Sequence, residues 1–162
     1  MRKIKRSMTS LFLLSALLFS QSHSPVYPQP EFIDPTGTYV LMGTVKKNRI
    51  TGHSGEIRVQ LLDSHRIALC FYINKGYPGY ESGSFMDTLV YHENSTHYIS
   101  VRDTTCTIIF YFRRNKVEMV PTYGNPHLGG GFAKGVLTSA IFEKSSDNKP
   151  IIQDLSAHGV SP

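Results

Sequence analysis

Tyrosine and histidine side chains recur on the glycine- and proline-rich segments that separate the apolar runs of this sequence. Such rings bury a large area and carry a polar tip, so a group of them on neighbouring loops is typical of a recognition surface. The alternative is that the rings pack on their own loop stems and hold the loops in place. The candidate ligand contacts are His53, Tyr77, Tyr80, Tyr123, Asn125 and His127.

Two histidines bracket the short polar segment Glu93–Thr96. A four-residue hairpin loop over this segment would place the imidazoles of His92 and His97 opposite each other, with the Glu93 carboxylate nearby. Two ring nitrogens and a carboxylate can ligate Zn²⁺ or Cu²⁺. The ligand set is incomplete, because no third strong ligand is held in place by the sequence pattern. We therefore predict a solvated turn and no metal site.

Asp87 lies among Phe85, Leu89 and Tyr91 at alternate positions of one apolar run. A carboxyl group on an apolar face has a raised pKa and can act as a general acid. The alternative is a carboxylate at a strand end that bonds to backbone or to an arginine. This alternative is favoured, because the run is apolar on both faces and the pattern does not show which face is inside.

No local signature of a nucleophile and its base accompanies these residues, and the glycines 129–131 lack the lysine of a phosphate loop. We therefore predict no catalytic residue and no cofactor. The alternative function is a small hydrolase or metal-dependent enzyme centred on Asp87 or on the turn of His92 and His97.

Cys70 and Cys106 are the only cysteines, and both lie in apolar runs. In an oxidising compartment such a pair usually forms a disulfide, whose Cα atoms must lie within about 7 Å of each other. The two runs are not neighbours in a closed meander of eight strands, so a bond would favour a flattened barrel or a sandwich. A disulfide and two buried thiols are the two alternatives.

From Thr36 onward, short runs of β-branched and aromatic residues are separated by turn residues, with no sustained helical period. One run places Ile57, Val59 and Leu61 on a single face, as in a half-buried antiparallel strand. The sequence therefore predicts an all-β domain. Its predicted strands are Gly37–Lys46, Gly55–Leu62, Arg66–Asn74, Ser84–His92, Thr96–Arg102, Thr105–Arg113, Lys116–Pro121 and Val136–Lys144.

The lengths of the connections between these runs are unequal. In an up-and-down meander the long connections, Lys47–Ser54, Lys75–Gly83 and Thr122–Gly135, all fall at one end, and the other end has only tight turns. We therefore predict a single antiparallel eight-stranded up-and-down barrel, lipocalin-like, with a loop-rich mouth. A two-sheet β-sandwich of the same strands is the alternative.

The start of the chain has the pattern of a secretory signal peptide over residues 1–22: a basic segment, an apolar run over residues 11–19 and small residues at Ser20 and Ser22. The apolar run is shorter than the roughly 20 residues that cross a bilayer, so we expect no membrane span. A proline-rich lead-in follows over 23–35, then the barrel domain over 36–146 and a polar tail over 147–162. We expect a periplasmic or secreted protein.

The formal net charge of +5 is concentrated in the predicted signal peptide, which holds four of the seventeen basic residues and none of the twelve acidic ones. Beyond it the basic residues form only short pairs, such as Lys46–Lys47 and Arg113–Arg114. A nucleic-acid-binding protein usually clusters its cations on one face. We therefore expect no nucleic-acid partner.

Four segments carry a resemblance to a known group: GTY at Gly37–Tyr39, GEIRVQLL at Gly55–Leu62, CTIIFYFRRNKVEM at Cys106–Met119 and GGFAKGVLTSAIFEKSS at Gly130–Ser146. Together they resemble small, largely uncharacterised secreted or periplasmic proteins of Gram-negative bacteria with lipocalin-like barrels similar to those of lysozyme inhibitors. The resemblance implies a β-barrel fold.

The same resemblance implies a second cysteine that pairs with Cys106. Gly130 occupies that position in this sequence, so Cys70 is the remaining candidate partner, and the loop around Gly130 is expected to lack a covalent tether. The group has no established functional residue, so none is transferred to this chain.

These features predict an exported, non-enzymatic binding module or inhibitor that engages a protein or small ligand of the cell envelope through its loop-rich end. A further interpretation is a structural domain whose apolar outer strands are buried in an oligomer.

Overall fold

The computed structural model describes residues 31–153. The predicted signal peptide, most of the lead-in and the end of the tail lie outside the described residues. Within them the chain forms one antiparallel sheet and a short 3₁₀ helix. The elements are β1 (Gly37–Leu41), β2 (Thr44–Lys46), β3 (Arg49–Asp63), β4 (Arg66–Gly76), β5 (Ser82–Val90), β6 (Ser95–Ile99), β7 (Cys106–Arg113), β8 (Lys116–Tyr123), η1 (Pro126–Gly131) and β9 (Ala140–Ser146).

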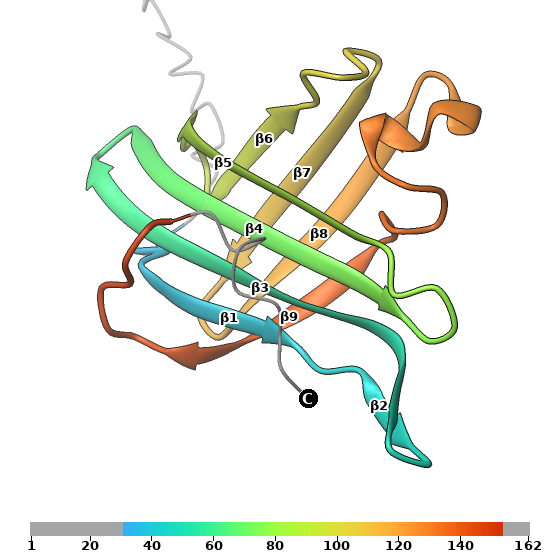
Figure 1. Ribbon diagram of the computed structural model, residues 1–162. Coiled ribbons are helices and arrows are strands. Elements are labelled where there is room, and N and C mark those ends of the chain that lie inside the picture. The colour runs from blue at the N-terminus through green and yellow to red at the C-terminus, as the bar shows by residue number, and fades with distance from the viewer. Residues whose placement is uncertain (1–30, 154–162) are drawn as a thin grey trace, which may run out of the picture.

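The sheet curls into a nearly closed barrel (Figure 1). Its strand order is β5-β4-β3-β1-β9-β8-β7-β6, and β1 therefore pairs with both β3 and β9. Neighbouring strands pair antiparallel, and the eight long strands follow one another around the wall. The predicted single up-and-down barrel is confirmed. The two ends of the strand order, β5 and β6, are joined by no ladder in the described part of the chain, and we call this gap the seam.

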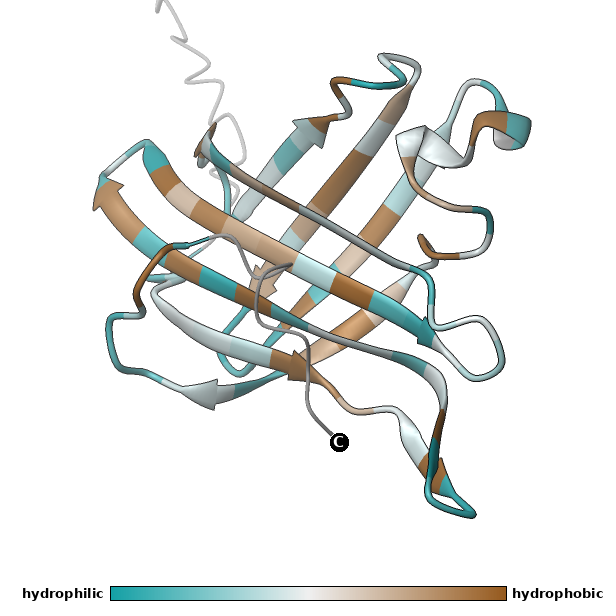
Figure 2. Ribbon diagram, viewed as in Figure 1, coloured by the Kyte–Doolittle hydropathy of each residue, from teal (hydrophilic) through white to brown (hydrophobic). Residues whose placement is uncertain are grey.

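The barrel forms because apolar residues alternate along the strands. On β3, Ile57 and Val59 are fully buried while their neighbours are partly exposed, and the same period is visible as alternating colours in Figure 2. On β7, Ile108, Phe110 and Phe112 are fully buried. Each such side chain contributes roughly 1.5–3 kcal/mol through removal of apolar surface from water. Period-two burial on strands such as β3 and β7 thus gives one interior core.

The predicted strand Gly37–Lys46 is two strands, separated at Met42 and Gly43. A Cβ at Gly43 would lie 2.6 Å from Cγ2 of Ile50, so the chain can cross there only because the residue is glycine. The predicted loop Lys47–Ser54 is a hairpin instead. Lys47 and Asn48 both have positive φ, which is the geometry of a tight two-residue turn, and β3 begins directly after them.

This hairpin extends the β1–β3 connection away from the barrel wall (Figure 1). We call residues 42–54 the arm. Strand β2 pairs only with β3, and all three of its residues are exposed.

The last predicted strand, Val136–Lys144, begins only at Ala140. Val136 and Leu137 are nevertheless buried, because the β8–β9 loop turns inward and places them in the core. Their apolar character predicts burial correctly, but burial here comes from a loop that closes one end of the barrel.

One end of the barrel carries the arm and the long loops over residues 77–81, 100–105 and 124–139, and we call it the loop-rich end. The other end has short turns and the lead-in, where the hydroxyl of Tyr39 donates to the carbonyl of Pro35 and that of Tyr91 to the carbonyl of Ile33. The predicted difference between the two ends is confirmed. Among the described residues, no helix is long and apolar enough to span a membrane.

Candidate binding site at the loop-rich end

Two predicted contact residues, Tyr77 and Tyr80, form an exposed aromatic pair on the β4–β5 loop. Their ring centroids are 6.3 Å apart in an edge-to-face arrangement, and the rings' residues are 44% and 45% exposed. The guanidinium carbon of Arg49 lies 4.4 Å from the centroid of the Tyr77 ring, which is a cation–π contact. The pair is therefore presented to solvent with a positive charge behind it.

The loop that carries this pair is held at both of its ends. The amide of Tyr77 donates to the carbonyl of Ile50 over 2.8 Å, which ties the loop to the arm. The ammonium of Lys75 forms an ion pair with Glu81 over 2.7 Å across the loop, and this contact lowers the pKa of the Glu81 carboxyl. The two rings are thus positioned before any ligand arrives, which reduces the entropy cost of binding.

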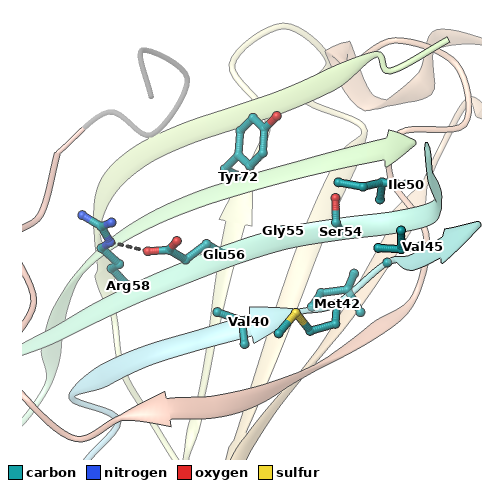
Figure 3. A pocket seen from close by; sticks show the side chains of 11 residues that line it. Val40, Met42, Val45, Ile50, Ser54, Gly55, Glu56, Arg58 and Tyr72 are labelled. Atoms are coloured by element: carbon teal, nitrogen blue, oxygen red, sulfur yellow. Dashed lines mark hydrogen bonds and ion pairs between the residues drawn. The ribbon is translucent and has the colours of Figure 1, made fainter. Parts of the chain in front are cut away.

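A groove of about 290 Å³ lies on the outer face of β1 and β3, where the arm joins the barrel wall (Figure 3). Its arm side is apolar and is formed by Met42, Val45 and Ile50. At the far end the carboxylate of Glu56 is ion-paired with the guanidinium of Arg58, as the dashed line in Figure 3 marks. Ile50 connects the two features, because its side chain lines the groove while its carbonyl binds Tyr77.

Three other predicted contact residues have structural roles. Nε2 of His53 donates to the carbonyl of Gly135 over 2.9 Å and so ties the arm to the β8–β9 loop. The hydroxyl of Tyr123 donates to the carbonyl of Leu137 over 3.1 Å, and burial raises the pKa of this phenol. The side chain of Asn125 caps η1 by accepting from the amide of His127.

His127, the sixth predicted contact, is exposed on η1 and lies on a different loop from the tyrosine pair. The structure therefore brings Tyr77 and Tyr80 together, leaves His127 on the neighbouring loop and uses His53, Tyr123 and Asn125 to hold loops in place. For these three residues the alternative interpretation, in which loop side chains support their own end of the barrel, describes the observed contacts.

The glycine-rich loop is tethered without a covalent bond. Gly130 has φ +67 and packs directly on Cys106, so that a Cβ placed on it would lie 2.4 Å from the Cys106 sulfur. The ring of Phe132 packs on Gly83 of β5, where a Cβ would lie 2.0 Å from the ring. Together with the bond from His53, these contacts hold the loop against three strands.

Asp87 lies on β5 at the seam, where a cavity of about 700 Å³ is open to solvent. Its residue is exposed, and one carboxylate oxygen accepts from the amide of Thr88. The favoured interpretation, in which the carboxylate bonds to backbone, describes this contact, and Asp87 does not lie on a buried apolar face. Phe85 and Leu89, which lie on the same face of β5 as Asp87, do point toward the core. At Asp87 this face is exposed to solvent, because β5 and β6 are not paired there.

The two histidines of the β5–β6 turn do not face each other. The turn is tighter than predicted: Glu93 and Asn94 have positive φ, and the backbone of His92 exchanges hydrogen bonds with Ser95. His97 lies farther along β6, opposite Ile109 of β7. In residues 31–153 no group of three or more histidine, cysteine, aspartate or glutamate side chains could hold a metal ion.

Both cysteines are free thiols. Cys106 lies in the interior core beside the glycine-rich loop. Cys70 alternates with the inward residues Leu69 and Phe71 and so faces the outside of β4, where the described end of the tail reaches it through Gln153. The two thiols are therefore separated by the barrel wall, and burial raises the pKa of each.

The sequence analysis missed the arm side of the site. The predicted strand Gly37–Lys46 contains Met42 and Val45, and the predicted loop Lys47–Ser54 contains Arg49 and Ile50. The residue pattern around Lys47–Asn48 is nevertheless that of a hairpin with a two-residue turn. Asparagine tolerates positive φ, so the turn was a detectable signal.

Comparison of the chain with family models, with curated proteins and with solved structures finds no match.

Proposed function

We propose that this protein is an exported, non-enzymatic binding module or inhibitor whose loop-rich end engages a protein or small ligand of the cell envelope. The observation that carries the proposal is the exposed pair Tyr77 and Tyr80, whose loop is tied by a backbone hydrogen bond to Ile50, a residue that lines the apolar groove. Aromatic side chains with a neighbouring arginine are the residue types that dominate binding energy at interfaces.

The groove and the tyrosine pair support different parts of one contact. An apolar side chain or ring of the partner fits the groove formed by Met42, Val45 and Ile50, and the tyrosine hydroxyls provide directed hydrogen bonds at its border. The tyrosine pair and the apolar side of the groove lie on a loop and an arm that are attached to the barrel wall, which is the common placement of recognition residues.

The test is capture of a partner from an envelope extract by the immobilised protein. The double variant Tyr77→Ala/Tyr80→Ala is expected to lose capture by at least tenfold, because truncation of two interface tyrosines typically removes more than 1 kcal/mol each. Tyr123 is left unchanged in this variant, since its hydroxyl holds Leu137.

The matched control is Tyr111→Ala, which removes an exposed tyrosine from the barrel wall on β7. It is expected to capture the partner as well as the parent protein does, and both variants are expected to keep the parent's far-ultraviolet circular dichroism spectrum. Unchanged capture by the double variant, or equal loss in the control, would contradict the proposal.

A further inference from the structure

Every loop segment at the loop-rich end presents an apolar side chain to solvent. Met42 and Val45 on the arm are 84% and 69% exposed, Val101 on the β6–β7 loop is 82% exposed, and Leu128 on η1 is 55% exposed. On the β4–β5 loop the exposed side chains are those of the tyrosine pair. Single exposed apolar residues are normal on a protein surface. Exposed apolar side chains also occur at the opposite end, at Phe32, Leu62 and Val90, but at the loop-rich end each of the four loops presents one.

Each of these apolar side chains has a cation close to it in the chain. Lys46, Lys47 and Arg49 follow Val45, Lys75 precedes the tyrosine pair, Arg102 follows Val101, and Lys134 lies on the same loop as Leu128.

The carboxylates of this end offset only part of that charge. Glu81 forms an ion pair with Lys75 and so neutralises this one cation, and Asp103 is buried and accepts from the hydroxyl of Thr105. No acidic residue occurs in the arm or in residues 124–139. The solvent-accessible charge of the loop-rich end is therefore positive.

The opposite end has no such excess. Its turns and the described parts of the lead-in and tail carry Glu31, Asp34, Asp63, Glu93 and Asp147 together with Arg66, Arg113, Arg114, Lys116 and Lys149. Acidic and basic side chains are mixed there, so an anionic surface is attracted to one end of the barrel only.

We propose that the loop-rich end docks on an anionic lipid surface, with the apolar side chains in the interfacial layer and the cations over the headgroups. Aliphatic side chains, tyrosines and neighbouring lysines or arginines are the combination that an anionic membrane interface binds. This inference rests on the proposed function, because both place binding at the loop-rich end of the barrel. It adds that this end binds an anionic lipid surface.

The spacing of the apolar side chains favours lipid over a protein surface. Protein interfaces concentrate their energy in a central, well-packed pocket. Met42 and Val45 line one groove of the arm, but Val45, Val101 and Leu128 lie on three different loops, and Val45 and Val101 line two separate cavities. A fluid interface accepts such separate insertions because it needs no complementary shape.

The experiment is co-sedimentation with vesicles that contain only lipid, either phosphatidylglycerol and phosphatidylcholine in equal parts or phosphatidylcholine alone. The full chain is compared with a chain that begins at residue 23, so that lipid binding by the apolar run of residues 11–19 is separated from binding by the barrel. We expect the shorter chain to bind the anionic vesicles and not the neutral ones. Binding should weaken strongly at about 1 M salt, where the Debye length is about 3 Å.

Two sets of variants test the charge and the apolar contribution. Lys46→Gln/Lys47→Gln is expected to weaken binding by roughly 25-fold, about fivefold for each cation. Val45→Ser and Leu128→Ser, on different loops, are each expected to weaken it by about tenfold. The matched controls are Arg113→Gln/Arg114→Gln and Leu62→Ser, which change an exposed cation pair and an exposed leucine at the opposite end and should bind as the parent does.

Three results would overturn the inference: no binding to anionic vesicles, even if an acidic protein is bound; equal binding to neutral vesicles; or equal loss of binding in the control variants. The vesicles contain no protein, so their failure leaves the capture experiment with Tyr77→Ala/Tyr80→Ala unaffected. Conversely, vesicle binding without capture of any partner would contradict the proposed function alone.

Discussion

The rings of Phe85 and Tyr98 are stacked face to face across the seam, with centroids 3.7 Å apart and an interplanar angle of 6°. They come from β5 and β6, the two neighbouring wall strands that share no backbone ladder. At the far end of these strands the turn holds them together, since His92 pairs with Ser95 and the hydroxyl of Thr96 donates to the carbonyl of Val90. Toward the loop-rich end the barrel is closed by side chains.

A double-mutant cycle measures what this stack contributes. Phe85→Leu and Tyr98→Leu should each destabilise the fold, and the two changes together should cost less than the sum of the single changes by about 0.5–1.5 kcal/mol, the usual coupling of an aromatic pair. Urea unfolding of the four proteins provides the free energies. The same cycle on the exposed pair Tyr77 and Tyr80 is the control and should give a smaller coupling. A coupling near zero for Phe85 and Tyr98 would show that the stack does not hold the seam.

Stability should fall in alkaline solution because of two buried phenols. Burial raises the pKa of Tyr39 and of Tyr91 in the folded state, while in the unfolded chain each ionises near its ordinary value of about 10. Above that pH the unfolded state binds fewer protons than the folded state, so the free energy of unfolding decreases as pH rises. Below it both states are protonated and this contribution is fully present.

The check is urea unfolding between about pH 8 and pH 11 for the parent and for Tyr39→Phe/Tyr91→Phe. The double variant should lose about 1 kcal/mol per hydroxyl at neutral pH, because the carbonyls of Pro35 and Ile33 lose their donors, but its stability should fall less above pH 10. Burial also raises the pKa of both cysteines and of the Tyr123 phenol, but these groups are common to the two proteins and cancel in the difference. Parallel pH curves for the two proteins would contradict the assignment.

The strands and the loop-rich end could be predicted because they depend on local signals. Period-two burial on β3 follows from the order of Ile57, Val59 and their polar neighbours, and the position of the long loops follows from chain order once the strands alternate in direction.

The seam and the roles of individual loop residues could not be predicted, because they depend on contacts between distant parts of the chain. Nothing in the sequence of β5 indicates that it lacks a ladder to β6, and Asp87 is exposed for that reason. His53 looks like a contact residue on a polar loop, yet its partner is a carbonyl 82 residues away. The sequence pattern shows that such a side chain is polar and lies on a loop, but its contacts depend on the tertiary packing of distant segments.

A cysteine at position 130 should bond to Cys106. The Cβ built there lies 3.1 Å from Cβ of Cys106, slightly closer than the roughly 3.5–4.5 Å of a disulfide, so the loop would have to move outward by only a few tenths of an ångström. Closing this loop should stabilise the fold by about 3 kcal/mol, offset by about 1 kcal/mol for a side chain at φ +67.

Thiol titration in denaturant and the unfolding temperature with and without reductant provide the measurement for Gly130→Cys. We expect one free thiol, that of Cys70, and a higher unfolding temperature only in the oxidised protein. Gly129→Cys is the matched control: it has a similar positive φ, but the nearest atoms to its Cβ belong to Lys134, so three thiols should remain free. Three free thiols in oxidised Gly130→Cys would refute the predicted pairing.

The bond from His53 to the carbonyl of Gly135 should control how often the β8–β9 loop opens. Lys134, directly before Gly135, is exposed and is a trypsin site, so cleavage after it reports the opening. His53→Ala removes the tether, worth about 1 kcal/mol, and should speed this cleavage by about fivefold while the urea midpoint changes little. His127→Ala is the control, because it removes an exposed histidine from the same loop and leaves the tether intact. If both variants are cleaved at the parent rate, the loop is held by Phe132 and Gly130 instead, and the arm and the glycine-rich loop move independently of each other.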